Sequence, residues 1–80
     1  MITEIMQAVC NQAPRKANRI MARGPGKLEA YVKMIVAQAD EEVDLQNVPK
    51  SDPNRDRMVR EVAMALALET ALSDEAPETM

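Results

Sequence analysis

Apolar residues recur every three or four positions through most of the chain, which is the spacing of one face of an α-helix. The first such stripe predicts a helix from about Thr3, which offers a hydroxyl N-cap, with Glu4 in the first turn. The apolar positions of this stripe are Ile2, Ile5, Met6, Val9 and Ala13. We therefore expect one side of this first helix to face a core.

Pro14 interrupts the pattern, because proline inside a helix removes a hydrogen bond and biases Ala13 away from helical geometry. The stripe nevertheless keeps its phase beyond the proline, at Ala17, Ile20 and Met21. A kinked helix and two short helices with a tight joint both fit this pattern. Gly24 followed by Pro25 predicts the end of the segment, since glycine suits a helix C′ position and proline prevents continuation.

A third stripe begins near Gly26 or Lys27 and predicts the next helix. Its apolar positions are Leu28, Val32, Ile35, Val36, Ala39 and Val43, with Tyr31 at the edge and Met34 off the stripe. Residues 40–42 place three carboxylates at the C-terminal end of this helix, where they oppose the macrodipole. We expect either fraying at this end or cations nearby that offset the charge.

Residues 44–51 read as a loop, and Asp52-Pro53 then predicts a helix start, with aspartate as N-cap and proline at the first position. The helix extends to about Ser73, and residues 62–68 are apolar on every side of it. A helix that is apolar all round is buried all round, so this one lies either at the centre of the bundle or at a homodimer interface. Its candidate interface residues are Met58, Val62, Met64, Leu66, Leu68 and Leu72.

The fold class predicted from these stripes is all-α, a compact bundle of three to four short helices. Residues 1–75 form a single domain, and residues 76–80 are expected to be a disordered acidic tail. The 80-residue chain has no Phe or Trp and only two glycines, which disfavours a sheet protein. A chain of this length buries a small core, and dimerisation would enlarge it.

The chain carries no sign of secretion or of a membrane span. Its first residues lack a basic segment followed by a long apolar one, and no apolar run approaches the roughly 20 residues that cross a bilayer. Cys10 is the only cysteine, so no disulfide forms within the chain. We expect a cytoplasmic protein, in the host cytoplasm if a phage encodes it.

Catalytic and metal chemistry lack their usual residues. The chain has no histidine to activate Cys10, Ser51 or Ser73, so we expect no enzyme activity, no catalytic residues and no cofactor. One cysteine without histidine cannot build a zinc site. Residues 52–56 reproduce the first ligand spacings of a calcium loop, but Arg57 stands where such a loop needs glycine.

The charge is distributed unevenly along the chain. Residues 1–28 carry five basic side chains and one acidic, a net charge of +4, whereas residues 29–80 carry five basic and twelve acidic, a net charge of −7. The basic side chains are Arg15, Lys16, Arg19, Arg23 and Lys27, hereafter the basic face. This segment is an outward binding face, a contact with the acidic half of the chain, or a solvated surface.

Three functions from different classes fit these properties. The first is a non-enzymatic helical protein that binds a larger partner with an acidic surface and modulates it, as small inhibitors or regulators encoded by phages and mobile elements do. The second is a DNA-binding regulator in which the basic face forms the second helix of a helix-turn-helix, with Asn18 available to an adenine edge. The third is a structural subunit of a larger assembly.

Overall fold

The computed structural model describes residues 1–75, with side chains described as far as residue 73. This part of the chain forms four helices and no strand: α1 (Ile2–Gln12), α2 (Pro14–Met21), α3 (Lys27–Leu45) and α4 (Arg55–Glu75). The predicted all-α bundle is confirmed. The predicted acidic tail, residues 76–80, lies outside the described residues.

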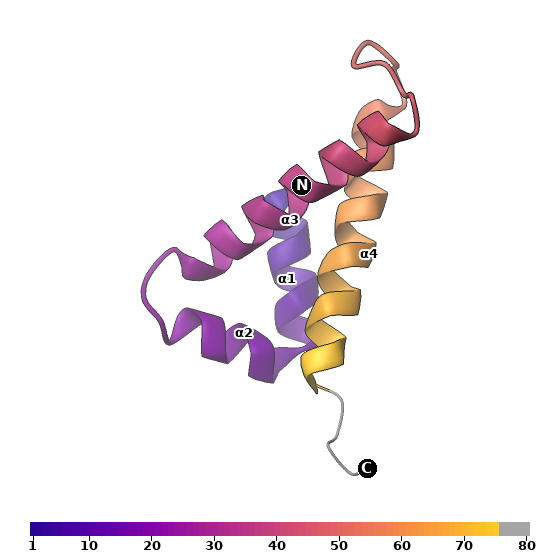
Figure 1. Cartoon of the computed structure of the whole chain (residues 1–80). Coiled ribbons are helices and arrows are strands. Elements are labelled where there is room, and N and C mark those ends of the chain that lie inside the picture. The colour runs from indigo at the N-terminus through magenta and orange to yellow at the C-terminus, as the bar shows by residue number, and fades with distance from the viewer. Residues whose placement is uncertain (76–80) are drawn as a thin grey trace.

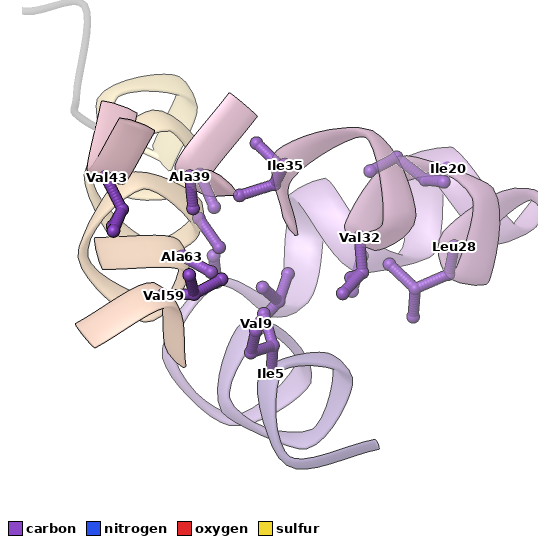
Figure 2. Close-up of a cluster of buried hydrophobic side chains, with 14 residues drawn as sticks. Ile5, Val9, Ile20, Leu28, Val32, Ile35, Ala39, Val43, Val59 and Ala63 are labelled. Atoms are coloured by element: carbon purple, nitrogen blue, oxygen red, sulfur yellow. The ribbon is translucent and has the colours of Figure 1, made fainter. Parts of the chain in front are cut away.

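The four helices pack around a shared core (Figure 1). Helices α1 and α4 run side by side, α3 crosses them obliquely, and α2 turns away from α1 toward the start of α3. The core runs from Val43 and Val59, between α3 and α4, through Val9 of α1 to Ile20 and Leu28, where α2 meets α3 (Figure 2). Each of the four helices contacts the other three, so α4 is one member of the bundle and not a central helix that the others surround.

The break at Pro14 produces two helices rather than one kinked helix. Ala13 adopts φ −138° and ψ 65°, its N–H donates to the carbonyl of Val9 at 2.8 Å, and Pro14 begins α2. Proline suits this position because its missing N–H has no partner in the first turn of a helix. The Thr3 cap is wrong: α1 begins at Ile2, with Met1 as N-cap and no side-chain cap bond.

The apolar stripe continues across the break at Ala17 and Ile20, which are buried, but not at Met21. The side chain of Met21 is 46% exposed, so its expected place on the buried stripe is wrong. The physical reason is that α2 starts again in a new direction after Ala13, and Met21 is its last residue. The stripe thus keeps its phase through the joint at Ala17 and Ile20 and is lost only at the end of α2.

Helix α3 follows its prediction closely. Its N-cap is Gly26 at φ 79°, a left-handed conformation that favours glycine. Its buried residues are Leu28, Val32, Ile35, Ala39 and Val43, while Tyr31 and Val36 are half-buried. Met34, predicted to lie off the stripe, is 52% exposed. The helix continues two residues into the predicted loop and ends at Leu45.

Helix α4 begins at Arg55, two residues later than predicted. The carboxylate of Asp52 accepts a hydrogen bond from the N–H of Asn54 at 2.8 Å, so it closes a local turn in front of the helix. Pro53 lies within this turn rather than at the first helical position. The carboxylate of Asp52 therefore accepts a backbone hydrogen bond, as an N-cap does, but it does so in the turn before the helix and not at its first residue.

The prediction that α4 is buried all round is wrong for a single copy of the chain. Its fully enclosed side is Val59 followed by the alanines Ala63, Ala67 and Ala71. Small side chains let neighbouring helices approach closely, so the alanines face inward while larger residues flank them. Of the predicted interface residues, Met58, Val62, Met64 and Leu66 pack against the chain's own core, Leu68 is half-buried, and Leu72 is 43% exposed.

Candidate protein-binding surface

The basic face lies on α2 and on the turn that leads into α3. Ala17 and Ile20 point into the core, which leaves Arg15, Asn18 and Arg19 exposed on the other side of α2. Arg23 lies in the turn and Lys27 is the first residue of α3, and both are exposed. Apart from Lys16, the predicted basic face is therefore exposed to solvent.

Lys16 differs from the other members of the basic face. It is half-buried, and its Nζ lies 5.8 Å from the centroid of the Tyr31 ring. A lysine ammonium at this distance from an aromatic ring makes a cation–π contact. Lys16 therefore connects α2 to α3 and is less exposed than the other members of the basic face.

Three cations of the basic face lack an ion-pair partner among the described residues; Lys50, in the loop before α4, is also exposed without an ion pair, but no other such cation lies near it in the sequence. Lys33 pairs with Glu29 at 3.3 Å, and Arg57 pairs with Glu61 at 3.5 Å. By contrast, no ion pair within the described part of the chain involves Arg19, Arg23 or Lys27. For these three, the hypothesis that the acidic half of the chain neutralises the basic face finds no support in residues 1–73.

A hollow of about 360 Å³ lies between α1 and the α2–α3 turn. Its lining residues are Met6, Met21, Gly24, Pro25, Gly26, Leu28 and Glu29. Arg23 and Lys27 belong to the same turn as the two glycines. Sequence reasoning missed this hollow because it assigned Met21 to the core. The available signal was the position of Met21 at the end of a helix, directly before a glycine-proline turn.

The opposite end of the molecule holds a cation of another kind. Arg55 at the start of α4 is 5% exposed, and its Nη2 contacts the carboxylates of Asp40 at 2.8 Å and Asp44 at 2.7 Å. Its guanidinium also donates to the carbonyl oxygens of Val48 at 2.7 Å and Asp40 at 3.3 Å. The arginine thus joins α4 to the loop before it and to the C-terminal part of α3. We call this arrangement the Arg55 clamp.

The Arg55 clamp places a cation beside the acidic C-terminal end of α3. The sequence predicted either fraying or offsetting cations there, and Arg55 is such a cation. Its hydrogen bond to Asp40 lowers the pKa of that carboxyl below its ordinary value, because the bond favours the charged form. The same bond, with that to Asp44, raises the pKa of Arg55. The carboxylate run was the signal for such a partner, although the pattern did not identify Arg55.

Two further hollows lie along α4. One of about 530 Å³ extends from Met1 and Ile2 across α3 to Arg55, and one of about 390 Å³ lies between Glu4 and Met64. Across the second, Arg60 and Glu4 approach to 4.0 Å. Within the described residues, no three cysteine or carboxylate side chains gather as a metal site, and no helix is long and apolar enough to span a bilayer.

Comparisons with known proteins give the chain no relatives. No family model matches it, and neither do the curated proteins or the solved structures. Its function must therefore be argued from its own surfaces.

Proposed function

We propose that this chain is a non-enzymatic modulator that binds a larger protein through its basic face. The observation that carries the proposal is the set of three exposed cations, Arg19, Arg23 and Lys27, with no ion-pair partner among the described residues. Exposed cations attract an acidic surface over distances up to the Debye length and direct how a partner docks. The partner therefore carries carboxylates in its interface.

The proposal of a protein without catalysis rests on its residue types. Cys10 is half-buried, and the chain has no histidine to take its proton. We place the protein in the cytoplasm, where a single reduced thiol is ordinary, and among the small regulators that phages and mobile elements encode. The last assignment is an analogy of size and chemistry.

A DNA-binding regulator is the second candidate, favoured by the exposure of Asn18 between Arg15 and Arg19 on α2. Two features favour the protein partner over DNA. The joint between α1 and α2 is the single residue Ala13, whereas the turn of a helix-turn-helix has three or four residues. The chain's net charge of −3 also opposes approach to duplex DNA more strongly than approach to a protein surface, because the duplex carries about one negative charge per 1.7 Å of its axis.

The test compares two triple charge reversals with the same effect on net charge. Arg19→Glu, Arg23→Glu and Lys27→Glu alter the basic face, and the control reverses three cations that have partners: Lys33→Glu, Arg57→Glu and Arg60→Glu. Each protein is used to capture partners from a lysate of its source cell, and the bound proteins are identified by mass spectrometry. We expect the first variant to lose its partner and the control to retain it, with both helical by circular dichroism.

Retention of the partner by the basic-face variant contradicts the proposal, as does equal loss in both variants. DNA binding is measured separately, by gel shift with duplex DNA at low and high salt. A complex that forms at micromolar protein and dissolves steeply with salt replaces the protein-binding proposal with the DNA-binding one.

A further inference from the structure

We infer that the hollow beside Met21 is an anchor site for a linear segment of the partner in which one apolar side chain is flanked by aspartate or glutamate. This inference rests on the proposed function and specifies the chemistry of the partner. It combines two observations, the apolar lining of the hollow and the cations of the turn that borders it.

The hollow provides apolar contact for one side chain. Met6, Met21, Pro25 and Leu28 supply its apolar surface, and its volume of about 360 Å³ is at the small end of ligand sites. Met21 is 46% exposed although it is a large apolar residue. Methionine has three rotatable bonds and a polarisable sulfur, so it adapts to side chains of different shape. An aliphatic or aromatic anchor would remove this exposed surface from water.

The turn provides the charge. Arg23 precedes Gly24 and Lys27 follows Gly26, so a cation stands on each side of the glycine-proline-glycine segment that lines the hollow. The one carboxylate in the lining, Glu29, forms an ion pair with Nζ of Lys33 at 3.3 Å on the surface of α3. Neither cation lines the hollow itself, so their attraction acts on the residues that flank the anchor and not on the anchor side chain. Acidic residues on both sides of the anchor complement this arrangement.

Two glycines set the backbone of the turn beside the hollow. Gly24 and Gly26 have φ of 142° and 79°, conformations that side-chain-bearing residues rarely adopt. A methyl group on Gly26 would meet no atom within 4 Å, so the space above that residue is open. A methyl group on Gly24, by contrast, would lie 3.9 Å from Cγ of Lys27, so the side chain of this cation runs along a residue that lines the hollow.

The test begins with a library of random twelve-residue peptides selected on the immobilised full-length protein. We expect enriched peptides to contain an apolar residue with Asp or Glu on both sides. The strongest peptide is then titrated into protein labelled with ¹³C at its methionine methyl groups. The Met6 and Met21 signals should shift, whereas those of Met34 and Met58 should not, because these two do not line the hollow. A selection without enrichment, or enrichment of basic peptides, overturns the inference.

Met21→Lys separates an apolar anchor from general attraction to positive charge. The variant adds a cation to the basic face but removes the apolar contact. An anchor site predicts that the affinity for the peptide falls about tenfold, whereas attraction to charge alone predicts that it rises. Met34→Lys is the matched control, because Met34 is exposed to a similar degree on another surface, and it should leave the affinity within about twofold of the parent. Unchanged or tighter binding by Met21→Lys refutes the anchor site.

The same variant distinguishes failure of this inference from failure of the proposed function. If Met21→Lys captures the native partner as well as the parent does, but reversal of Arg19, Arg23 and Lys27 abolishes capture, the basic face binds the partner without the hollow. The proposed function then stands and the anchor site is wrong. If neither change affects capture, both proposals are wrong.

Discussion

The two ends of the molecule use cations in opposite ways. At the α3–α4 end, Arg55 is buried and contacts the two carboxylates and two carbonyl oxygens that surround it. At the α2–α3 end, Arg19, Arg23 and Lys27 are exposed and have no ion pair with a described residue. Residues of the same chemical type therefore contribute to folding at one end and remain available for binding at the other. Lys50, at the α3–α4 end, is also exposed without an ion pair, so it is the grouping of three such cations on α2 and the α2–α3 turn that makes the basic face the place to look for function.

The largest expected effect comes from breaking the Arg55 clamp. Arg55→Ala leaves Asp40 and Asp44 close together without their cation and removes donors from the carbonyl oxygen of Val48. Asp40 and Asp44 are each 46% exposed, so the loss comes mainly from the hydrogen bonds and packing of the Arg55 side chain, and we expect Tm to fall by about 10 °C for a domain of this size. Thermal unfolding followed by circular dichroism measures the change.

Arg57→Ala is the control, because Arg57 is exposed and its pair with Glu61 spans one helical turn on the surface. Such pairs contribute little, so Tm should move by at most about 2 °C. If the two variants melt at the same temperature, Arg55 does not hold the two helices together, and the contrast between the two ends of the molecule is lost.

The next prediction concerns the outer side of α4, where a second copy of the chain would bind. Leu72 is 43% exposed, and the alanine stripe on the opposite side of the helix already fills the core contact. If the chain is a homodimer through α4, Leu72→Glu yields monomers, which halves the mass measured by light scattering. Leu45→Glu is the control at a more exposed leucine, 80% accessible at the end of α3, and should leave the mass unchanged. A parent chain that is monomeric at high concentration rules out the dimer.

A smaller effect concerns acid stability. The pKa of Asp40 is lowered by its hydrogen bond to Arg55, so the folded state holds the proton less tightly than the unfolded state does. This contribution is fully present above the ordinary pKa of 3.8 and is lost as the pH falls below it. Urea unfolding between pH 6 and pH 3 should therefore show a midpoint that falls more steeply for the parent than for Asp40→Asn. Parallel curves would mean that the clamp does not favour the charged form of Asp40.

The helices and most of the core could be predicted from the sequence because their signals are local. Periodic apolar residues and proline set the positions of α1, α2 and α3 to within a few residues. The errors concern residues whose burial depends on how the helices pack against one another. Met21 is exposed because α2 changes direction at Ala13. The alanines of α4 are buried in place of its leucines because the three other helices pack against that side. Neither the direction of a helix after a break nor the identity of its neighbours can be read from periodicity.

The candidate site was predicted in part for the same reason. The cluster of cations was visible from charge alone, and four of the five are exposed as an outward face requires. The contact of Lys16 with Tyr31, the hollow beside Met21 and the partners of Arg55 all join residues from different helices. Such contacts depend on the packed structure, so the sequence could indicate only that the acidic end of α3 needed a partner.

The smallest expected change in stability is that of Lys27→Glu. It tests the contrast between Arg55 and the basic face most directly, because its sign is opposite to that of Arg55→Ala. Lys27 is the first residue of α3, where the positive end of the helix macrodipole disfavours a cation. Lys27→Glu should therefore stabilise the fold by about 0.3–1 kcal/mol in urea unfolding, while it weakens binding of an acidic partner. Lys33→Glu, in the interior of the same helix, provides the control: it loses its pair with Glu29 and should be neutral or slightly destabilising. A gain in stability combined with a loss of binding would show that the cation at position 27 serves recognition at the expense of the helix, whereas Arg55 serves the fold. A Lys27→Glu variant that is less stable than the parent would place Lys27 among the structural cations and remove it from the binding surface.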